Sequence, residues 1–256
     1  MNSGSLRSLS PLEIEPGAAR AWYALTSDIA SASTAEIALT WLSDPERIRH
    51  ERFHEDDDRR MFLLGRVMAR ALVGAALNVS PTAWQWREGP HGRPEIAGTS
   101  SGLQFNLAHS AGMVACAVSC GHEVGIDVED LHRQRVDPAV VRRYCSRSEV
   151  ADVESQGEGW HDRFLHYWTL KEAYLKARGL GISVPLREIS FHIHEGHEGP
   201  EGHEVRISFE GSLAGSDDRW TFLLARPTDR HLVAVAVSTA IDARPPQSIE
   251  RLTGLL

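Results

Sequence analysis

The sequence contains few cysteines and fewer basic than acidic residues. Its three cysteines, Cys116, Cys120 and Cys145, form neither a disulfide framework nor a C-x-x-C zinc motif. This favours a reducing compartment, and we expect a cytoplasmic protein. The 27 basic residues are outnumbered by 35 acidic ones, which gives a formal net charge of −8. A protein whose main task is to coat nucleic acid or an anionic membrane rarely carries this balance.

Long apolar runs are also missing from the sequence. The longest, near residues 67–77 and 232–237, are interrupted or shorter than the roughly 20 residues that span a bilayer. The first 17 residues show no apolar signal core. Because 42% of the residues are hydrophobic and 24% are charged, the composition excludes a largely disordered or fibrous chain. A chain of 256 residues can form one large domain or two small ones.

Hydrophobic periodicity predicts an α+β protein. Helices are expected over residues 34–52, 57–77, 138–153 and 161–178, and Gly179 is expected to cap the last one. Strand patterns occupy residues 21–30, 83–86, 93–96, 103–108, 113–119, 123–129, 204–210, 219–225 and 231–238. Because Gly121 separates residues 113–119 from 123–129, we expect these two strands to form a hairpin.

A sparse internal similarity divides the chain. Asp58, Gly74 and Val79 mark one long helix and its exit, and Asp162, Gly179 and Val184 mark another. Two copies of one α+β unit would explain this similarity, but the matches are too few to decide the question. The expected division is an N-terminal half over residues 18–120 and a C-terminal half over residues 121–240. Residues 1–17 and 241–256 are expected to be tails.

Two short polar segments could carry chemistry. FNLAHS (105–110) places His109 beside Ser110 at the mouth of an apolar hairpin, and alone it favours an ordinary capped turn. In GIDVED (125–130), Asp127 and Glu129 share one face because side chains alternate along a strand. Two carboxylates on one face repel each other unless a cation lies between them, and oxygen ligands suit Mg²⁺. A solvated acidic strand end explains this pair equally well.

The helical segment WTLKEAYLK (168–176) is a third candidate. Glu172 lies beside the predicted buried stripe, which contains Trp168 and Lys171, and Lys176 follows one turn later. A surface Glu–Lys pair at this spacing stabilises a helix by only a few tenths of a kcal/mol. Alternatively, Glu172 is a third carboxylate for the metal and Lys176 contacts a phosphate.

Other features favour no function of their own. His192, His194, His197 and His203 are dense enough for a transition metal, but glycines and glutamates between them favour an exposed hairpin loop. The sequence has no P-loop and no Rossmann glycine fingerprint, which argues against nucleotide hydrolysis and hydride transfer.

In this order, FNLAHS, GIDVE and WTLKEAYLK followed by GLG resemble the signature of the 4′-phosphopantetheinyl transferases. The W-x-x-K-E-A form resembles the Sfp-type branch, and HGRP (91–94) is similar to the family's G-[KR]-P segment. The resemblance covers about residues 47–185. It implies a pseudo-dimer of two similar α+β halves with the active site in the cleft between them.

The resemblance also implies an activity, that of a holo-[acyl-carrier-protein] synthase. The 4′-phosphopantetheine arm of coenzyme A moves to a serine of an apo acyl or peptidyl carrier protein. The reaction depends on Mg²⁺ and releases adenosine 3′,5′-bisphosphate.

The resemblance further implies roles for individual residues. Asp127, Glu129 and Glu172 match the Mg²⁺ ligands, and Asp127, Glu172 and Lys176 match the catalytic set. In that set Glu172 is the general base and Lys176 contacts the pyrophosphate. For coenzyme A, His109 matches a phosphate contact and Arg93 a nucleotide contact. The candidate contacts to the 3′-phosphate are Arg47, Arg49, Arg59 and Arg60, with the pair Arg59 and Arg60 favoured over the others. A solvated helix face explains that pair as well, and Ala108 replaces a serine that is frequent in the family.

Two other functions stay open at this point. One is a non-catalytic relative that binds coenzyme A or a carrier protein, and the other is a Mg²⁺-dependent phosphohydrolase with the same carboxylates. Coenzyme A and a carrier protein are the expected partners of a monomer that binds neither nucleic acid nor membrane. Because carrier domains are usually acidic, an acidic enzyme needs a local basic or apolar docking patch, which the sequence does not locate.

Overall fold

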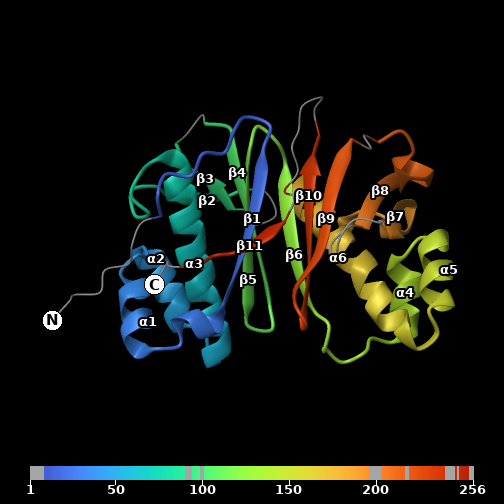
Figure 1. Ribbon diagram of the computed structural model, residues 1–256, viewed down its shortest axis with the longest axis horizontal. Coiled ribbons are helices and arrows are strands. Elements are labelled where there is room, and N and C mark those ends of the chain that lie inside the picture. Colours follow the sequence, from blue (N-terminus) through green and yellow to red (C-terminus); the bar gives the residue numbers. More distant parts are fainter. Residues whose placement is uncertain are drawn as a thin grey trace.

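Two α+β halves lie side by side, with helices on the two outer sides and two β-sheets between them (Figure 1). The computed structural model describes residues 9–89, 94–98, 101–195, 203–216, 219–239, 246 and 248–253. The expected fold class, a pseudo-dimer of similar α+β halves, is confirmed.

The elements of the N-terminal half run from β1 to β5. They are β1 (Ala19–Leu25), α1 (Ala32–Leu39), α2 (Asp44–Glu51), α3 (Asp56–Leu77), β2 (Trp86–Glu88), β3 (Pro94–Ile96), β4 (Leu103–Ser110) and β5 (Met113–Cys120). Those of the C-terminal half are β6 (Val124–Asp130), α4 (Pro138–Tyr144), α5 (Arg147–Ser155), α6 (Trp160–Arg178), β7 (Ile189–Glu195), β8 (His203–Phe209), β9 (Trp220–Thr228) and β10 (His231–Ser238). A last strand, β11 (Ile249–Arg251), follows, and the 3₁₀ turns include η5 (Leu186–Glu188) and η6 (Gly211–Leu213).

The two halves repeat one order of elements. Each has a strand, two short helices, a long helix, a small two-stranded sheet and an antiparallel hairpin. The main sheets have the equivalent orders β1-β5-β4 and β6-β10-β9, and β11 extends the first. This equivalence decides in favour of the duplication that the sequence left open. We propose that the domain boundaries follow it, near residue 121.

The predicted hairpin between residues 113–119 and 123–129 is wrong. Strand β5 pairs with β4 and β1, whereas β6 pairs with β10 in the other sheet. The chain crosses from one sheet to the other at Gly121, whose φ is 82°. Apolar alternation identifies a strand but not its partner, which explains the error.

Three further expectations need correction. The helix expected over residues 34–52 is α1 and α2, and the one over 138–153 is α4 and α5. New helices begin where Ser43 and Ser146 form capping boxes with Glu46 and Glu149. Residues 241–256 are not simply a tail, because β11 pairs in parallel with β1.

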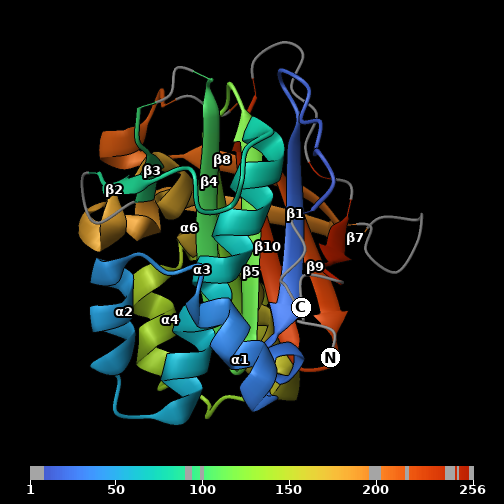
Figure 2. The ribbon, with the colours of Figure 1, turned by 90° about the vertical axis from the view of Figure 1, so that its left-hand side faces the viewer.

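Alternating side chains of the central strands build three apolar clusters. On β5, Val114, Cys116 and Val118 pack toward α3, whereas Ala115 and Ala117 face the second sheet. Strand β10 divides its residues in the same way between α6 and the space between the sheets. Helix α3 lies across one face of the first sheet (Figure 2), and the second sheet packs against the other face. Because β5 and β10 are covered on both faces, nearly all of their residues are buried.

Strands β4 and β6 meet at the seam between the two sheets. Asn106 on β4 is 5% exposed, and its Oδ1 accepts the amide hydrogen of Ile126 on β6 at 2.9 Å. The Asn106 side chain therefore makes a hydrogen bond that a backbone carbonyl would make between neighbouring strands of a continuous sheet. A second link lies at one end of the sheets, where His231 Nε2 is 3.2 Å from the carbonyl oxygen of Ala111.

Strand β6 also lies unusually close to helix α6. A Cβ atom at Gly125 would collide with the carbonyl oxygen of Ala173 and the amide nitrogen of Ala177. Only glycine permits this approach, which places the face of β6 that carries Asp127 against α6.

Within the described ranges, no helix is long and apolar enough to cross a membrane. All three cysteines are free thiols.

The first prediction concerns the seam. Replacing Asn106 by alanine leaves the buried amide of Ile126 unpaired, so the free energy of unfolding should fall by about 1–3 kcal/mol. Urea unfolding measures the loss, with exposed Gln134→Ala as the control. An unchanged free energy of unfolding in Asn106→Ala would show that the seam does not depend on this bond.

The second prediction concerns the approach of β6 to α6. Gly125→Ala forces the two backbones apart and should cost about 1–3 kcal/mol, the usual range for overpacking. Gly159→Ala is the matched control, because its Cβ atom would have its nearest neighbour at 3.8 Å. Equal melting temperatures for the two variants would contradict the close approach.

Candidate functional site

The expected acidic residues meet on the facing surfaces of β6 and α6. Asp127 and Glu129 lie on β6, and Glu172 and Lys176 lie one turn apart on α6. Lys176 Nζ donates a hydrogen bond to Asp127 Oδ1 at 2.6 Å. The face of β6 opposite the inter-sheet cluster, which includes Gly125, carries both carboxylates toward this helix.

Burial and the charges of neighbouring side chains shift the pKa values of Asp127 and Glu172. Burial raises the pKa of Asp127 to about 7, the Lys176 ammonium opposes the rise, and the charges of Glu129 and Glu172 add to it. Burial also raises the pKa of Glu172, again against the effect of Lys176 and with a contribution from Glu129. The site therefore holds more negative charge than one lysine neutralises.

Two carboxylate oxygens of the site have no hydrogen-bond partner in the described part of the chain. Asp127 Oδ2 and Glu172 Oε1 are buried, and neither contacts a donor among the described residues. Buried polar atoms in folded proteins are almost always paired, so two unpaired carboxylate oxygens on facing elements call for a cation. Oxygen atoms of this kind suit Mg²⁺, and the donor set therefore fits that ion.

The third expected ligand is engaged elsewhere. Glu129 Oε2 forms an ion pair with Arg133 Nη1 at 2.7 Å, and Lys176 holds one oxygen of Asp127. In this arrangement, the described part of the chain contains no ready-made group of three His, Cys, Asp or Glu side chains around a common point. Metal binding by all three carboxylates would require Glu129 to leave Arg133.

His109 on β4 borders the same region from the N-terminal half. Desolvation and the charge of Lys176 lower its pKa, while Asp58 on α3 opposes this. His109 and Asp58 line a cavity of about 320 Å³ between β4 and α3. Because the charge of Lys176 on α6 contributes to the lowered pKa of His109 on β4, the carboxylates and this cavity lie near each other.

The arginines that line this cavity are not Arg59 and Arg60, the pair that the sequence favoured as contacts to the 3′-phosphate. Arg59 bonds to Asp56 Oδ1 at 2.7 Å, Arg60 Nη1 lies 3.9 Å from Asp57, and neither arginine lines the cavity. Both arrangements match the solvated helix face that the sequence analysis offered as the alternative. Their role as phosphate contacts stays a prediction, and Arg93 lies outside the described residues.

Arg49 and Arg66 line the cavity instead. Arg49 was one of the four sequence candidates, but Arg66 was missed. The guanidinium carbon of Arg66 lies 3.6 Å from the ring centroid of Trp86 and 4.8 Å from that of Phe62. The contact between Arg66 and Phe62 could have been predicted from the sequence, because the two residues are four positions apart on α3.

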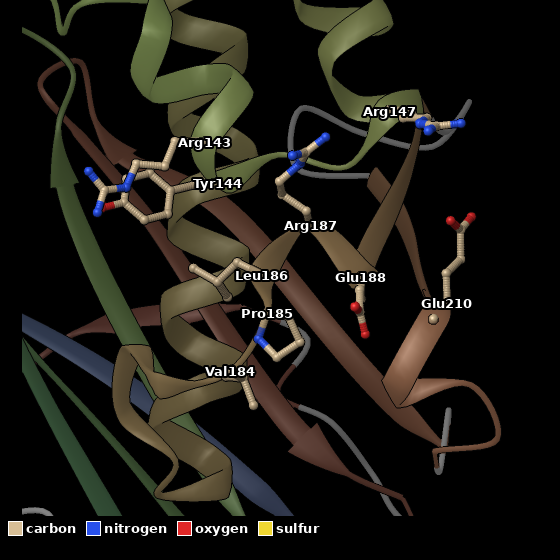
Figure 3. Close-up of a pocket in the computed structure, with 10 residues that line it drawn as sticks. Arg143, Tyr144, Arg147, Val184, Pro185, Leu186, Arg187, Glu188 and Glu210 are labelled. Carbon is tan, nitrogen blue, oxygen red and sulfur yellow. The ribbon is translucent and has the colours of Figure 1, made fainter.

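A larger cavity, of about 630 Å³, lies in the C-terminal half (Figure 3). Its lining residues come from the end of α4, the start of α5, η5 and η6, and include Arg143, Tyr144, Arg147, Arg187 and Glu210. None of the expected site residues that the structure describes lines it. The chemistry is therefore expected at the seam, although the wider opening lies in the C-terminal half.

Two family models match the two structural halves. The model described as 4′-phosphopantetheinyl transferase superfamily matches residues 123–233. The model described as 4′-phosphopantetheinyl transferase, N-terminal, matches residues 29–121.

Similar proteins span most of the chain. The phosphopantetheinyl transferase of Thraustochytrium sp. is 29% identical over 94% of this chain and 86% of its own length. The 4′-phosphopantetheinyl transferase HetI of Nostoc sp. is 32% identical over 79% of this chain and 81% of its own length. The 4′-phosphopantetheinyl transferase Sfp of Bacillus subtilis is 27% identical over 62% and 70%, respectively. The chain therefore belongs to the 4′-phosphopantetheinyl transferase superfamily and has relatives in its Sfp-type branch.

Proposed function

We propose that this protein transfers the 4′-phosphopantetheine arm of coenzyme A to a serine of an apo acyl or peptidyl carrier protein. The observation that carries the proposal is the set of Asp127, Glu172 and Lys176 on β6 and α6, where two buried carboxylate oxygens lack partners among the described residues. Sequence relatives that are named phosphopantetheinyl transferases also support the proposal. Cytoplasmic location and a monomeric state stay predictions of the sequence.

The carboxylates would hold Mg²⁺. Asp127 and Glu172 offer free oxygens, and Glu129 would join them after leaving Arg133. When bound, Mg²⁺ would neutralise charge on the pyrophosphate of coenzyme A. Lys176, now paired with Asp127, would then be released toward the phosphate that leaves with adenosine 3′,5′-bisphosphate.

Glu172 would also accept the proton of the incoming serine hydroxyl. A carboxylate has two oxygens, so one oxygen of Glu172 would bind Mg²⁺ while the other accepts this proton. The serine oxygen attacks the β-phosphorus, and the bond from that phosphorus to the bridging oxygen breaks. Adenosine 3′,5′-bisphosphate leaves with that oxygen.

The cavity between α3 and β4 would bind the nucleotide end of coenzyme A. His109, Arg49 and Arg66 supply polar and cationic groups, and Phe62 and Phe53 supply aromatic surface. Cations and aromatic rings together suit a phosphorylated nucleoside.

Intact-mass measurement of a panel of apo-carrier proteins tests the function. Incubation with coenzyme A and Mg²⁺ should add one phosphopantetheine arm to at least one carrier. Coenzyme A binding without any mass gain would favour the non-catalytic relative. Hydrolysis of coenzyme A without a carrier would favour the phosphohydrolase.

The third prediction concerns Glu172. Glu172→Gln keeps the shape of the side chain but removes its charge and basicity, so single-turnover transfer should slow by about 10²–10⁴-fold. Glu154→Gln, which removes a helical carboxylate from a surface pair with Arg142, is the control and should transfer normally. A near-normal rate in Glu172→Gln would refute the catalytic role of this residue.

The large cavity of the C-terminal half offers a docking place for an acidic carrier. Arg143, Arg147 and Arg187 have no ion-pair partner among the described residues, although the protein as a whole is acidic. Glu188 is engaged, because its Oε2 accepts the amide of Ser212 at 2.7 Å. Figure 3 shows the three arginines spread along one rim above an apolar floor of Pro185 and Leu186.

This rim is connected to the catalytic helix. Tyr144, which lines the cavity, packs its ring edge-on against Trp168 of α6 at 5.3 Å, one turn before Glu172. A carrier bound at the rim would therefore lie against the helix that presents Glu172. The rim would serve as the local basic patch that an acidic enzyme needs for an acidic carrier.

The fourth prediction reverses the charge of the rim. Arg143→Glu combined with Arg187→Glu should raise the KM for the carrier by about tenfold or more, because like charges would then face each other. The KM for coenzyme A should not change. Arg206→Glu, on an exposed position of β8, is the control. An unchanged KM for the carrier would place the docking surface elsewhere.

A further inference from the structure

The centre of the C-terminal half contains a lysine that is fully enclosed. Lys171 and Glu149 are both 0% exposed, and Lys171 Nζ lies 2.9 Å from Glu149 Oε2. Nζ also donates to the carbonyl oxygens of Leu186 and Ile189. All three hydrogens of the ammonium group are therefore used, and Lys171 cannot reach a substrate in the seam.

Glu149 extends this contact to two more segments. Its Oε1 accepts the amide hydrogen of Phe191 on β7 at 2.8 Å, and its Oε2 accepts that of Ser146 at 2.7 Å. The ion pair thus joins α6 to the start of α5, to the 3₁₀ turn η5 and to β7. We name these two side chains, Lys171 and Glu149, the α6 anchor.

The α6 anchor fixes how α6 is turned about its axis. Successive residues of a helix differ by 100°, so fixing Lys171 on the inner side also fixes the direction of Glu172. On the other side of α6, Gly125 allows β6 to contact the backbone at Ala173 and Ala177. A small rotation of α6 would move Glu172 and Lys176 away from Asp127.

Stability alone does not require this ion pair. Replacing a buried ion pair by apolar side chains of similar volume is often neutral or stabilising, because both charges were removed from water. A fixed geometry is a benefit that an apolar pair, which has no directional bonds, would not provide.

The N-terminal half contains an equivalent arrangement. Glu46, in the capping box of α2, pairs with Arg70 of α3 at 2.6 Å, just as Glu149 of the α5 capping box pairs with Lys171 of α6. The carboxylates of the site are carried by β6 and α6, so only the second pair bears on them. The first pair is a control for kcat only, because Glu46 Oε1 also lies 3.8 Å from Nε of Arg66, which lines the cavity.

We propose that Lys171 is a positioning residue, whose buried ion pair with Glu149 sets the rotation of α6 and so directs Glu172 and Lys176 toward Asp127. This inference rests on the proposed function, because the importance of that direction depends on the transfer reaction.

The fifth prediction separates positioning from simple stabilisation. Lys171→Met leaves the charge of Glu149 unpaired, so its melting temperature should fall. Adding Glu149→Gln removes that charge, and the melting temperature should recover at least in part. At a temperature where every variant is folded, kcat should stay at least tenfold below the wild-type value in both, with little change in the KM for coenzyme A. Arg70→Met should lose melting temperature but keep its kcat.

Three other outcomes would contradict the positioning role or the proposed function. A double variant with wild-type kcat would overturn the positioning role, and so would an equal loss of kcat in Arg70→Met. If the wild-type protein transfers nothing to any carrier, the proposed function fails, and hydrogen exchange of residues 171–178 tests the anchor alone. Exchange there should be faster in the double variant than in Arg70→Met, and equal exchange would contradict the anchor.

Discussion

The seam between β4 and β6 is the constraint on which the rest of the structure depends. Each half could cover its own sheet with its own helices, but the proposed site needs groups from both. The bond from the Ile126 amide to Asn106 joins the two strands at their buried centre. Three residues further along β4 lies His109, and one residue further along β6 lies Asp127. The two strands that link the halves therefore also carry residues of the candidate site.

The site concentrates negative charge where burial makes it costly. Burial raises the pKa of Asp127 most, Lys176 opposes that rise, and the charges of Glu129 and Glu172 add smaller contributions to it. Unpaired buried carboxylate oxygens destabilise a fold by roughly 1–3 kcal/mol each, so the arrangement exists at the expense of stability. A cation would relieve the cost, which explains why these residues fit a metal-dependent reaction better than a structural role. The α6 anchor, with every polar atom paired, provides rigidity next to this strained region.

The sequence predicted the elements with strong local signals. Helix α3 was expected over residues 57–77 and α6 over 161–178, each within one residue of the observed start and end. Side-chain alternation correctly placed Asp127 and Glu129 on one face of β6, and the duplication was visible as a few repeated residues. Capping by Ser43 and Ser146 divided two expected helices, although both S-x-x-E patterns stand in the sequence.

Other features depended on long-range pairing, which local patterns do not encode. The partner of β6 is β10, more than 100 residues later, whereas the sequence favoured its neighbour β5. Strand β7 was missed because its histidines were interpreted as part of an exposed loop, although Ile189, Phe191 and Ile193 alternate with polar residues. Arg66 was missed because its role comes from Trp86, which is distant in the sequence but stacks on it.

The most direct test of the account is the hydrogen-exchange footprint of coenzyme A with Mg²⁺. If the site lies at the seam, protection should appear in both halves, around His109 on β4, Arg66 on α3 and Lys176 on α6. Protection limited to one half, or located at the arginine rim around Arg143 and Arg187, would contradict a site built from both halves.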